Sequence, residues 1–383
     1  SVCERGARVV IHRIELTNFR VYEHASIELS DGVTAVVGQN ALGKTSLAEA
    51  MSWLSTLRSF RGAPNDMLIR IGCDSAWLRA EITRDDGREV LVEAEINRAG
   101  RNRVLVNKQR LQRVRDLLGV VRTTVFAPND LDLVYDGPAV RREFMDDALT
   151  ALSPSFDRTV QELERVVRQR NVLLKQTFGR LTPDTETTLD VWDDKFVEVG
   201  TQVGDARARL VAQLAPYVQE AYETLACEAT PLDLVYEPSW RAPGLAAALA
   251  AARAEDVRRG LSTVGPHRDE LELALKGMPI RNTGSQGECR TMSLALRLAV
   301  HRMVTEKVGE APLLVLDDVL SELDLRRSAA LLSHLPPGQV FITTAQPLPL
   351  AARPDTEVLL HAGAVVQITR GGEEPASGPG EAT

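Results

Sequence analysis

The sequence of 383 residues predicts an α/β fold with a second, mostly helical lobe. Two short apolar runs, at residues 33–37 and 313–316, have the length and composition of buried parallel strands, and each is followed by a polar motif. Long stretches between them repeat apolar residues at the spacing of helices. We therefore expect a parallel sheet that carries functional motifs at the ends of its strands, with long helices supplied by the middle of the chain.

The first motif is a phosphate loop, G-x-x-x-x-G-K-[ST], between the strand at 33–37 and a predicted helix at 46–57. Its glycines let successive backbone N–H groups face a phosphate, and the helix N-terminus adds partial positive charge. Lys44 supplies a full charge near the β and γ phosphates, and the Thr45 hydroxyl is placed to hold Mg²⁺. A chance lysine in a glycine turn is the alternative, but it does not explain the flanking strand and helix. The predicted nucleotide-binding residues are Gly38, Gln39, Asn40, Ala41, Leu42, Gly43, Lys44 and Thr45.

Further strands are predicted on both sides of this loop. Residues 8–37 have the alternating pattern of strands. Residues 77–106 are predicted to form a β-meander, with turn signals between its strands. Another strand at 120–126 ends before Pro128. Later in the chain, GPHRDE at 265–270 fits either a turn that leads into a strand or acid–base chemistry by His267 and its neighbours, and we favour the structural interpretation.

Three long helices are predicted at 138–151, 154–178 and 186–227. The third carries a seam of apolar residues spaced three and four apart, which is typical of antiparallel helix packing. The seam consists of Leu189, Trp192, Phe196, Val199, Val203, Ala206, Leu210 and Tyr217, with Gln213 as its polar member. An alanine-rich stretch at 241–254 is either a helix or a variable insertion, and a final hairpin is expected at 357–368.

A second motif, SQGECR at 285–290, precedes a helix-like stretch and resembles the signature motif of ABC-type ATPases. In that superfamily the serine hydroxyl, the glycine backbone and the helix N-terminus of one subunit close over the γ-phosphate held by the other. The resemblance gives this role to Ser285 and Gly287. An ordinary N-cap is the alternative. The position 32 residues before Asp317, and a following SELD run that resembles an ABC D-loop, favour the signature.

The third motif, LLVLDDVLSELD at 313–324, places two carboxylates at the end of an apolar strand in a Walker B pattern. Asp317 is expected beside Thr45, where it would hold Mg²⁺ directly or through water. Asp318 is placed to polarise the water that attacks the γ-phosphate. A solvated turn is the alternative, but the strand before it is aliphatic and a phosphate loop is present to be served.

Together these motifs resemble the RecF family, and the similarity covers nearly the whole chain. It includes IHRIELTNFRVYE at 11–23, RSFR at 58–61, FAPNDLDLVYDGPAVRREFMD at 126–146, LERVVRQRNVLLK at 163–175, VGPHRDEL at 264–271 and VFITT at 340–344. Ala41 and Leu42 depart from a more usual Gly-Gln, Asn129 stands where an acid is common, and Glu288-Cys289 replace a Gln pair. None of these changes removes a phosphate, metal or water ligand, but the last pair lies where the partner subunit's nucleotide would dock.

The resemblance implies an α/β, ABC-type P-loop ATPase head with a second, mostly helical lobe. Residues 1–135 would form the N-terminal part of the ATPase lobe, with the phosphate loop and the β-meander. Residues 136–254 would form the helical lobe. Residues 255–370 would complete the ATPase lobe with the signature, Walker B motif and D-loop, and residues 371–383 would be a disordered tail.

The resemblance also implies an ATP- and Mg²⁺-dependent DNA-binding protein of recombinational repair, replication-gap processing and the SOS response. It would act as an ATP-gated homodimer on single-stranded DNA or gapped duplex and help load a RecA-type recombinase. Its protein partners would be of the RecO and RecR type. The implied activity is a weak, DNA-stimulated ATPase with Lys44, Asp318 and Ser285 as its catalytic residues.

Two other functions share these motifs. In the nucleotide-binding subunit of a transporter, the phosphate loop and signature usually lie about half as far apart as the 247 positions between Gly38 and Ser285. In an SMC-type structural tether, hundreds of coiled-coil residues separate the two motifs. The seam helix expected here has about 28 residues and spans only ~42 Å. Both alternatives are therefore disfavoured.

Composition limits where and how the chain acts. No apolar run approaches the ~18 residues of a membrane span, and the first residues lack a secretory hydrophobic region, so we expect a cytoplasmic protein that does not contact a membrane. The four cysteines are isolated and predict neither zinc sites nor disulfides. The net charge of −8 argues that any DNA contact is local.

The strongest candidate for a DNA contact is a basic stretch without acids between residues 98 and 115. A solvated charged face is the alternative interpretation. Arg141 with Arg142, and a group on the helix at 154–178, are weaker candidates. The basic stretch contains Arg98, Arg101, Arg103, Lys108, Arg110, Arg113 and Arg115, and the helix group contains Arg165, Arg168 and Arg170.

Overall fold

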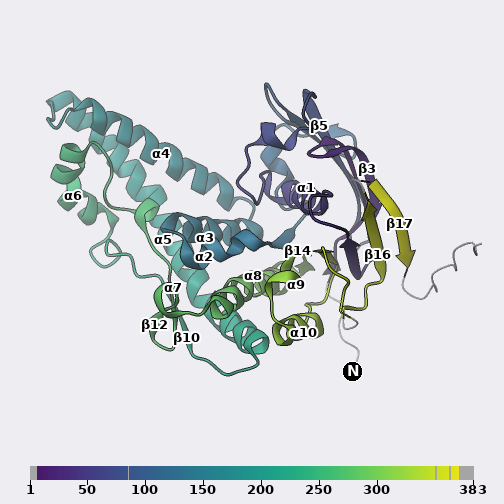
Figure 1. Ribbon diagram of the computed structural model, residues 1–383. Coiled ribbons are helices and arrows are strands. Elements are labelled where there is room, and N and C mark those ends of the chain that lie inside the picture. Colours follow the sequence, from purple (N-terminus) through teal and green to yellow (C-terminus); the bar gives the residue numbers. More distant parts are fainter. Residues whose placement is uncertain (1–6, 85, 350–351, 362–363, 371–383) are drawn as a thin grey trace, which may run out of the picture. The chain divides into compact units, whose positions relative to one another are not determined.

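The computed structural model describes residues 7–84, 86–349, 352–361 and 364–370 (Figure 1). The chain divides into two compact units. Unit 1 comprises residues 1–130, 221–228 and 294–383, and unit 2 comprises residues 131–220 and 229–293. The predicted disordered tail and Cys3 lie outside the described residues.

Unit 1 contains a six-stranded sheet in the order β17-β16-β4-β15-β14-β9, in which only the β16–β17 pairing is antiparallel. All five residues of β14 and of β15 are buried, as expected for central parallel strands. Because β4, β15 and β14 are neighbours and run parallel, the segments after these three strands emerge at one edge of the sheet. The strands are β4 (Val33–Val37), β9 (Thr123–Phe126), β14 (Leu313–Asp317), β15 (Val340–Thr344), β16 (Thr356–His361) and β17 (Ala364–Arg370).

A second, antiparallel sheet of unit 1 has the order β3-β2-β5-β6-β7-β8. Side chains of β5 alternate between buried and more exposed positions, so one face joins the core of the unit. This sheet confirms the predicted β-meander. Its strands are β2 (Val10–Phe19), β3 (Tyr22–Glu28), β5 (Ser75–Thr83), β6 (Glu89–Asn97), β7 (Arg103–Val106) and β8 (Gln109–Arg110).

The helix after the phosphate loop, α1 (Lys44–Thr56), packs against β9, β14 and β15. Its residues from Ser46 to Leu54 are all buried, which places Trp53 in the core. The remaining elements of unit 1 are β1 (Ala7–Arg8), η1 (Asn65–Leu68), η2 (Val114–Leu117), β13 (Glu310–Ala311), α9 (Val319–Glu322) and α10 (Leu325–Ser333). The short helix η3 (Pro128–Leu131) ends with the first residue of unit 2. The helix α8 (Gln286–Val308) begins in unit 2 and belongs to unit 1 from Leu294 onward.

Unit 2 is mostly helical. Its small sheet has the order β10-β11-β12, and the alanine-rich stretch forms most of the helix α6. The elements are α2 (Asp132–Tyr135), α3 (Pro138–Leu152), α4 (Phe156–Gln176), α5 (Pro183–Ala226), β10 (Leu232–Val235), α6 (Leu245–Arg259), η4 (Pro266–Arg268), β11 (Glu272–Leu275), β12 (Met278–Pro279) and α7 (Ile280–Thr283). The last residues of α5 belong to unit 1.

The helix α5 differs from its predicted seam in two ways. The helix itself agrees with the prediction at 186–227, but its 44 residues span ~66 Å and so extend beyond the seam of about 28 residues. The predicted seam is buried as far as Leu210, apart from the half-buried Trp192, but burial then moves to Leu214 and Val218 instead of Gln213 and Tyr217. A strict seven-residue repeat drifts by about 20° per heptad on a straight helix, so after three heptads the buried stripe falls on the neighbouring residues.

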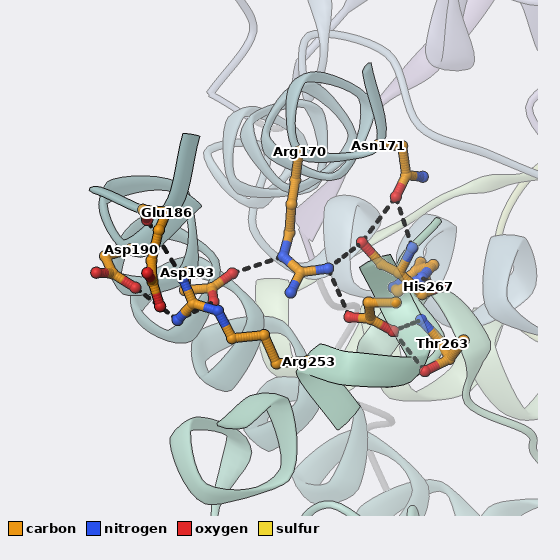
Figure 2. Close-up of polar contacts among 10 residues, drawn as sticks. Arg170, Asn171, Glu186, Asp190, Asp193, Arg253, Thr263 and His267 are labelled. Atoms are coloured by element: carbon orange, nitrogen blue, oxygen red, sulfur yellow. Dashed lines mark hydrogen bonds and ion pairs between the residues drawn. The ribbon is translucent and has the colours of Figure 1, made fainter. Parts of the chain in front are cut away.

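A buried arginine ties three helices of unit 2 together (Figure 2). Arg170 of α4 is fully buried, and its guanidinium donates to Asp193 of α5 at 2.6 Å and to Asp256 of α6 at 2.7 Å. It also donates to the Ser262 hydroxyl at 2.8 Å. Asp256 in turn accepts two hydrogen bonds from Thr263, so the carboxylate is held from several directions. Arg253 also lies 3.8 Å from Asp193, so two cations face two carboxylates in the helical core. The weaker prediction that Arg170 contacts DNA is therefore wrong.

We predict that Arg170→Ala lowers the free energy of unfolding of unit 2 by about 3–5 kcal/mol, because it leaves two carboxylates without their buried cation. Chemical denaturation followed by circular dichroism measures this change. Arg168→Ala is the matched control, because Arg168 is exposed on the same helix and its loss should change stability by less than about 0.5 kcal/mol. Equal stability of the two variants would contradict a structural role for Arg170.

Candidate nucleotide-binding site

The phosphate loop connects β4 to α1 and is shaped by two left-handed residues, Ala41 with φ 68° and Gly43 with φ 99°. A Cβ atom at Gly43 would lie 2.6 Å from the Tyr22 hydroxyl and 2.8 Å from Val21, so only glycine fits there. Alanine at position 41 adopts the left-handed conformation at a cost of about 1–2 kcal/mol. The loop is therefore braced by the β2–β3 turn and carries strain at one of its departures from the family pattern.

Lys44 reaches back across the loop. Its ammonium donates to the carbonyls of Gly38 and Gln39 at 2.7 and 2.8 Å. Burial lowers the pKa of Lys44, while the carboxylates of Asp318 and Asp317 act in the opposite direction. The side chain thus holds its charge against the first residues of the loop, where it could neutralise a phosphate group.

Thr45 and Asp317 meet as predicted. The Thr45 hydroxyl donates to Asp317 Oδ1 at 3.2 Å, and the Thr343 hydroxyl donates to the same oxygen at 2.6 Å. Burial raises the pKa of Asp317, and these two hydrogen bonds work against the rise. Hydroxyl and carboxylate oxygens are the hard ligands that suit Mg²⁺, so Thr45 and Asp317 fit this ion. No group of three or more His, Cys, Asp or Glu side chains among the described residues could form a different metal site.

Asp318 has the features of a strained functional residue. Its backbone is left-handed, with φ 53° and ψ 26°, and its N–H donates to the Thr343 carbonyl at 3.1 Å. Its Oδ1 atom is buried and has no hydrogen-bond partner within the part of the chain that the structure describes. A buried acceptor without a partner destabilises the fold, and a bound water would relieve this. The geometry therefore suits a side chain that orients water.

The sequence-based prediction missed two residues near this site. Thr343 was noted only as part of a strand, and Arg61 only as part of RSFR. The register of β14 and β15, which pairs Asp317 with Thr343, is the signal that would have identified the threonine, but it requires the sheet order. The positive charge of Arg61 lowers the pKa of Asp317, against the effect of burial.

The RSFR segment is fixed by its neighbours. Arg20 donates to the buried carboxylate of Glu49 at 2.6 and 2.7 Å, and the Ser59 hydroxyl donates to the same carboxylate. The Asn129 amide donates to the Phe60 carbonyl at 2.8 Å. An ionised acid at position 129 has no proton to donate, so asparagine adds a contact that the more usual residue would not make.

The proposed signature lies in unit 2 at the start of α8. The Ser285 N–H and hydroxyl both donate to Glu288 Oε2 at 2.8 Å, and the Glu288 N–H donates to Ser285 Oγ at 3.2 Å. These contacts form a capping box. Ser285 is therefore an N-cap, as the alternative interpretation held, but an N-cap exposed at a helix N-terminus remains compatible with binding a phosphate of a second subunit.

The contacts of GPHRDE support the structural interpretation. His267 lies at 3.1 Å from the Ser262 carbonyl, and burial lowers its pKa to about 4. Asp269 accepts hydrogen bonds from the side chains of Tyr236 and Trp240. All of these groups serve to hold the segment in unit 2.

The candidate DNA-binding residues have different outcomes. The seven basic residues between positions 98 and 115 are exposed. Five lie on or beside β6, β7 and β8, and Arg113 and Arg115 lie at η2. Arg103 is paired with Glu95 at 3.5 Å. Arg141 is buried and donates to both oxygens of Glu270, so its prediction as a DNA contact is wrong. Arg165 is exposed but paired with Glu162 at 2.7 Å. The basic stretch stays the leading candidate.

Comparisons with known proteins identify the family of this chain. The family model for the RecF/RecN/SMC N terminal domain matches residues 10–353. A protein of Streptomyces avermitilis named "DNA replication and repair protein RecF" is 41% identical over 351 residues, which cover 88% of this chain and 93% of the relative. A protein of the same name from Pseudarthrobacter chlorophenolicus is 37% identical over 374 residues, with the same coverage of each chain.

Solved structures give the same result. A recombination mediator protein RecF with ATP, described in the RecFOR pathway, matches with a TM-score of 0.88 and 26% identity over 96% of this chain and 99% of that chain. An Smc head domain derived from Pyrococcus furiosus matches with a TM-score of 0.57 and 16% identity over 94% of this chain and 96% of that chain, which shows a shared fold. The predicted fold class, an ABC-type α/β head, is confirmed. The chain belongs to the RecF family.

Proposed function

We propose that this chain is an ATP-gated DNA-binding ATPase of recombinational repair and replication-gap processing. The observation that carries the proposal is the meeting, at one edge of the parallel sheet, of the Lys44 loop, the Thr45–Asp317 pair and the unpartnered oxygen of Asp318. These groups supply a phosphate cation, oxygen ligands for Mg²⁺ and a site for water. The names of the RecF relatives support the biological role.

In this proposal each side chain has a distinct task. Lys44 and the loop N–H groups neutralise the β and γ phosphates, and Thr45 and Asp317 hold Mg²⁺, which would stabilise the charge that develops on the phosphates. Asp318 positions the attacking water. Ser285 and Gly287 of one subunit complete the site of the other, so ATP binding and dimerisation depend on each other.

DNA binding is assigned to the basic stretch of unit 1, because its seven side chains are exposed and follow one another along β6, β7, β8 and η2. Each phosphate that they neutralise releases counterions, so binding should weaken steeply with salt.

We propose that the substrate is single-stranded DNA or gapped duplex and that DNA stimulates a slow ATPase. We also propose that the protein helps load a RecA-type recombinase in the cytoplasm, with RecO- and RecR-type partners. The lobe boundaries given above stay part of this proposal.

No helix of the described residues is long and apolar enough to cross a membrane. The SMC-type alternative gains no support from the helical unit. The 44 residues of α5 are far fewer than the hundreds of coiled-coil residues that an SMC-type tether places between its nucleotide motifs.

Lys44→Met should weaken ATP binding at least about tenfold, which corresponds to ~1.4 kcal/mol, because the phosphates lose their fixed cation. Titration with a fluorescent ATP analogue measures the affinity. Lys108→Met removes the same charge from an exposed position of unit 1 and should leave the affinity unchanged. A loss of less than about threefold in the Lys44 variant would contradict the assignment of the phosphate loop.

Asp318→Asn should preserve Mg-ATP binding but slow hydrolysis by roughly 10²–10⁴-fold, because the amide cannot accept a proton from water. Asparagine tolerates the left-handed backbone at this position, so the fold should persist. Single-turnover hydrolysis and nucleotide affinity are measured together. Asp317→Asn provides the contrast, since it should weaken the Mg²⁺ dependence of binding. Hydrolysis at the parental rate in the Asp318 variant would rule this residue out as the base.

Ser285→Arg should leave the ATP affinity of the single chain within about twofold and abolish ATP-driven dimerisation and hydrolysis, because the bulky cation blocks the proposed interface. Sedimentation velocity with and without ATP measures the ATP-driven dimerisation. Ala247→Arg is the control, as it places the same side chain at an exposed position of α6. Normal dimerisation of the Ser285 variant would leave the capping box as the whole role of this serine.

A further inference from the structure

The capping box at the start of α8 engages the same groups that the proposed two-subunit site requires. The Ser285 hydroxyl carries one proton, and it donates this proton to Glu288 Oε2. The Ser285 N–H donates to the same oxygen. In the isolated chain, neither donor is therefore available to a phosphate of a second subunit.

The acceptor is also charged. Hydrogen bonds from Ser285 lower the pKa of Glu288, and Lys276 adds to this effect, so the carboxylate is ionised at neutral pH. A γ-phosphate that approached Ser285 would meet like charge at hydrogen-bonding distance, which disfavours its docking. The site can close only if the carboxylate moves or the repulsion is offset.

The Lys276 ammonium is placed to receive the carboxylate. It lies 3.6 Å from Glu288 Oε1, the oxygen that does not contact Ser285. It belongs to the turn between β11 and β12, where its backbone is left-handed with φ 54° and its N–H donates to the Pro231 carbonyl at 2.9 Å. The lysine thus stands on a fixed turn, while its side chain is about half exposed.

The backbone around Ser285 has little freedom to adjust. A Cβ atom at Gly284 would lie 2.8 Å from the Ile280 carbonyl and 3.0 Å from the sulfur of the buried Cys289. The Thr291 hydroxyl donates to the Gly287 carbonyl at 2.8 Å. Release of the Ser285 N–H therefore requires movement of the Glu288 side chain, whereas the hydroxyl proton can also rotate toward a competing acceptor.

We propose that Glu288 is a positioning residue that competes with the γ-phosphate of a second subunit for the Ser285 donors, and that Lys276 receives its carboxylate when the site closes. The hydrogen bonds between Ser285 and Glu288 would set the protein concentration at which ATP drives dimerisation. The inference rests on the proposed two-subunit function. It predicts that removing the charge of Glu288 strengthens dimerisation, whereas a purely structural role in helix capping predicts weakening or no change.

Glu288→Gln tests this prediction, because glutamine can keep a capping box but carries no charge. At saturating ATP, the midpoint of dimerisation should fall to a roughly tenfold lower protein concentration, equivalent to about 1.4 kcal/mol. Sedimentation velocity over a concentration series gives the midpoint. Glu272→Gln, at an exposed position of β11, changes the net charge equally and should match the parental chain. The ATP affinity of the single chain should be the same in all three proteins.

Lys276→Met gives the complementary test. The Lys276 variant should raise the protein concentration at the midpoint of dimerisation, because the Glu288 carboxylate loses the cation that would receive it. The same substitution should have little effect when it is combined with Glu288→Gln. Equal midpoints for Glu288→Gln, Glu272→Gln and the parental chain, all dimeric with ATP, would overturn this inference alone. An equal effect of Lys276→Met in both backgrounds would overturn the role of the lysine. Absence of ATP-driven dimers from every variant would overturn the proposed function and this inference together.

Discussion

The nucleotide-binding site depends above all on the two hydrogen bonds that Asp317 Oδ1 accepts from Thr45 and Thr343. Asp317 and Thr45 lie 272 positions apart in sequence, and they meet because β15 pairs with both β4 and β14. The register of these strands pairs Asp317 with Thr343, and Thr343 with Val36 just before the loop. A shift of one residue along either strand would turn Asp317 away and remove the proposed metal ligand from the loop.

Much of this site was predictable because its motifs are local. A glycine-rich loop with Lys44 needs only its own strand and helix to be recognised, and an acid after an aliphatic strand points to the same edge of a parallel sheet. Thr343 and Arg61 were missed because their proximity to Asp317 depends on sheet order and on the Arg20–Glu49 contact. Likewise, Arg170 looks like a solvated helix arginine until α5 and α6 supply its carboxylates, and the α5 seam shifts because a straight helix does not keep a seven-residue repeat.

The two units use charge differently. In unit 2 the guanidinium of Arg170 is buried with matched carboxylates, which specifies how the helices pack but leaves little for chemistry. In unit 1 the oxygen of Asp318 is buried without a partner, and Lys44 is satisfied only by loop carbonyls that a phosphate could replace. At Ser285 the donors are satisfied but by an exchangeable side chain. We place ligands where a buried oxygen lacks a partner, as at Asp318, and where the partner can be exchanged, as at Lys44 and Ser285. A buried atom without a partner does not mark a ligand by itself, because Arg170 Nη2 of the scaffold also has none among the described residues.

The central claim is that one chain supplies the phosphate loop and another supplies the signature. The most direct measurement is ATP hydrolysis by an equimolar mixture of the Lys44→Met and Ser285→Arg chains, neither of which should be active by itself. The mixed dimer would contain one site with both defects and one site with the intact Lys44 of one chain and the intact Ser285 of the other. The account predicts that mixing restores hydrolysis from this single site. A mixture as inactive as its components, although mixed dimers form, would contradict it.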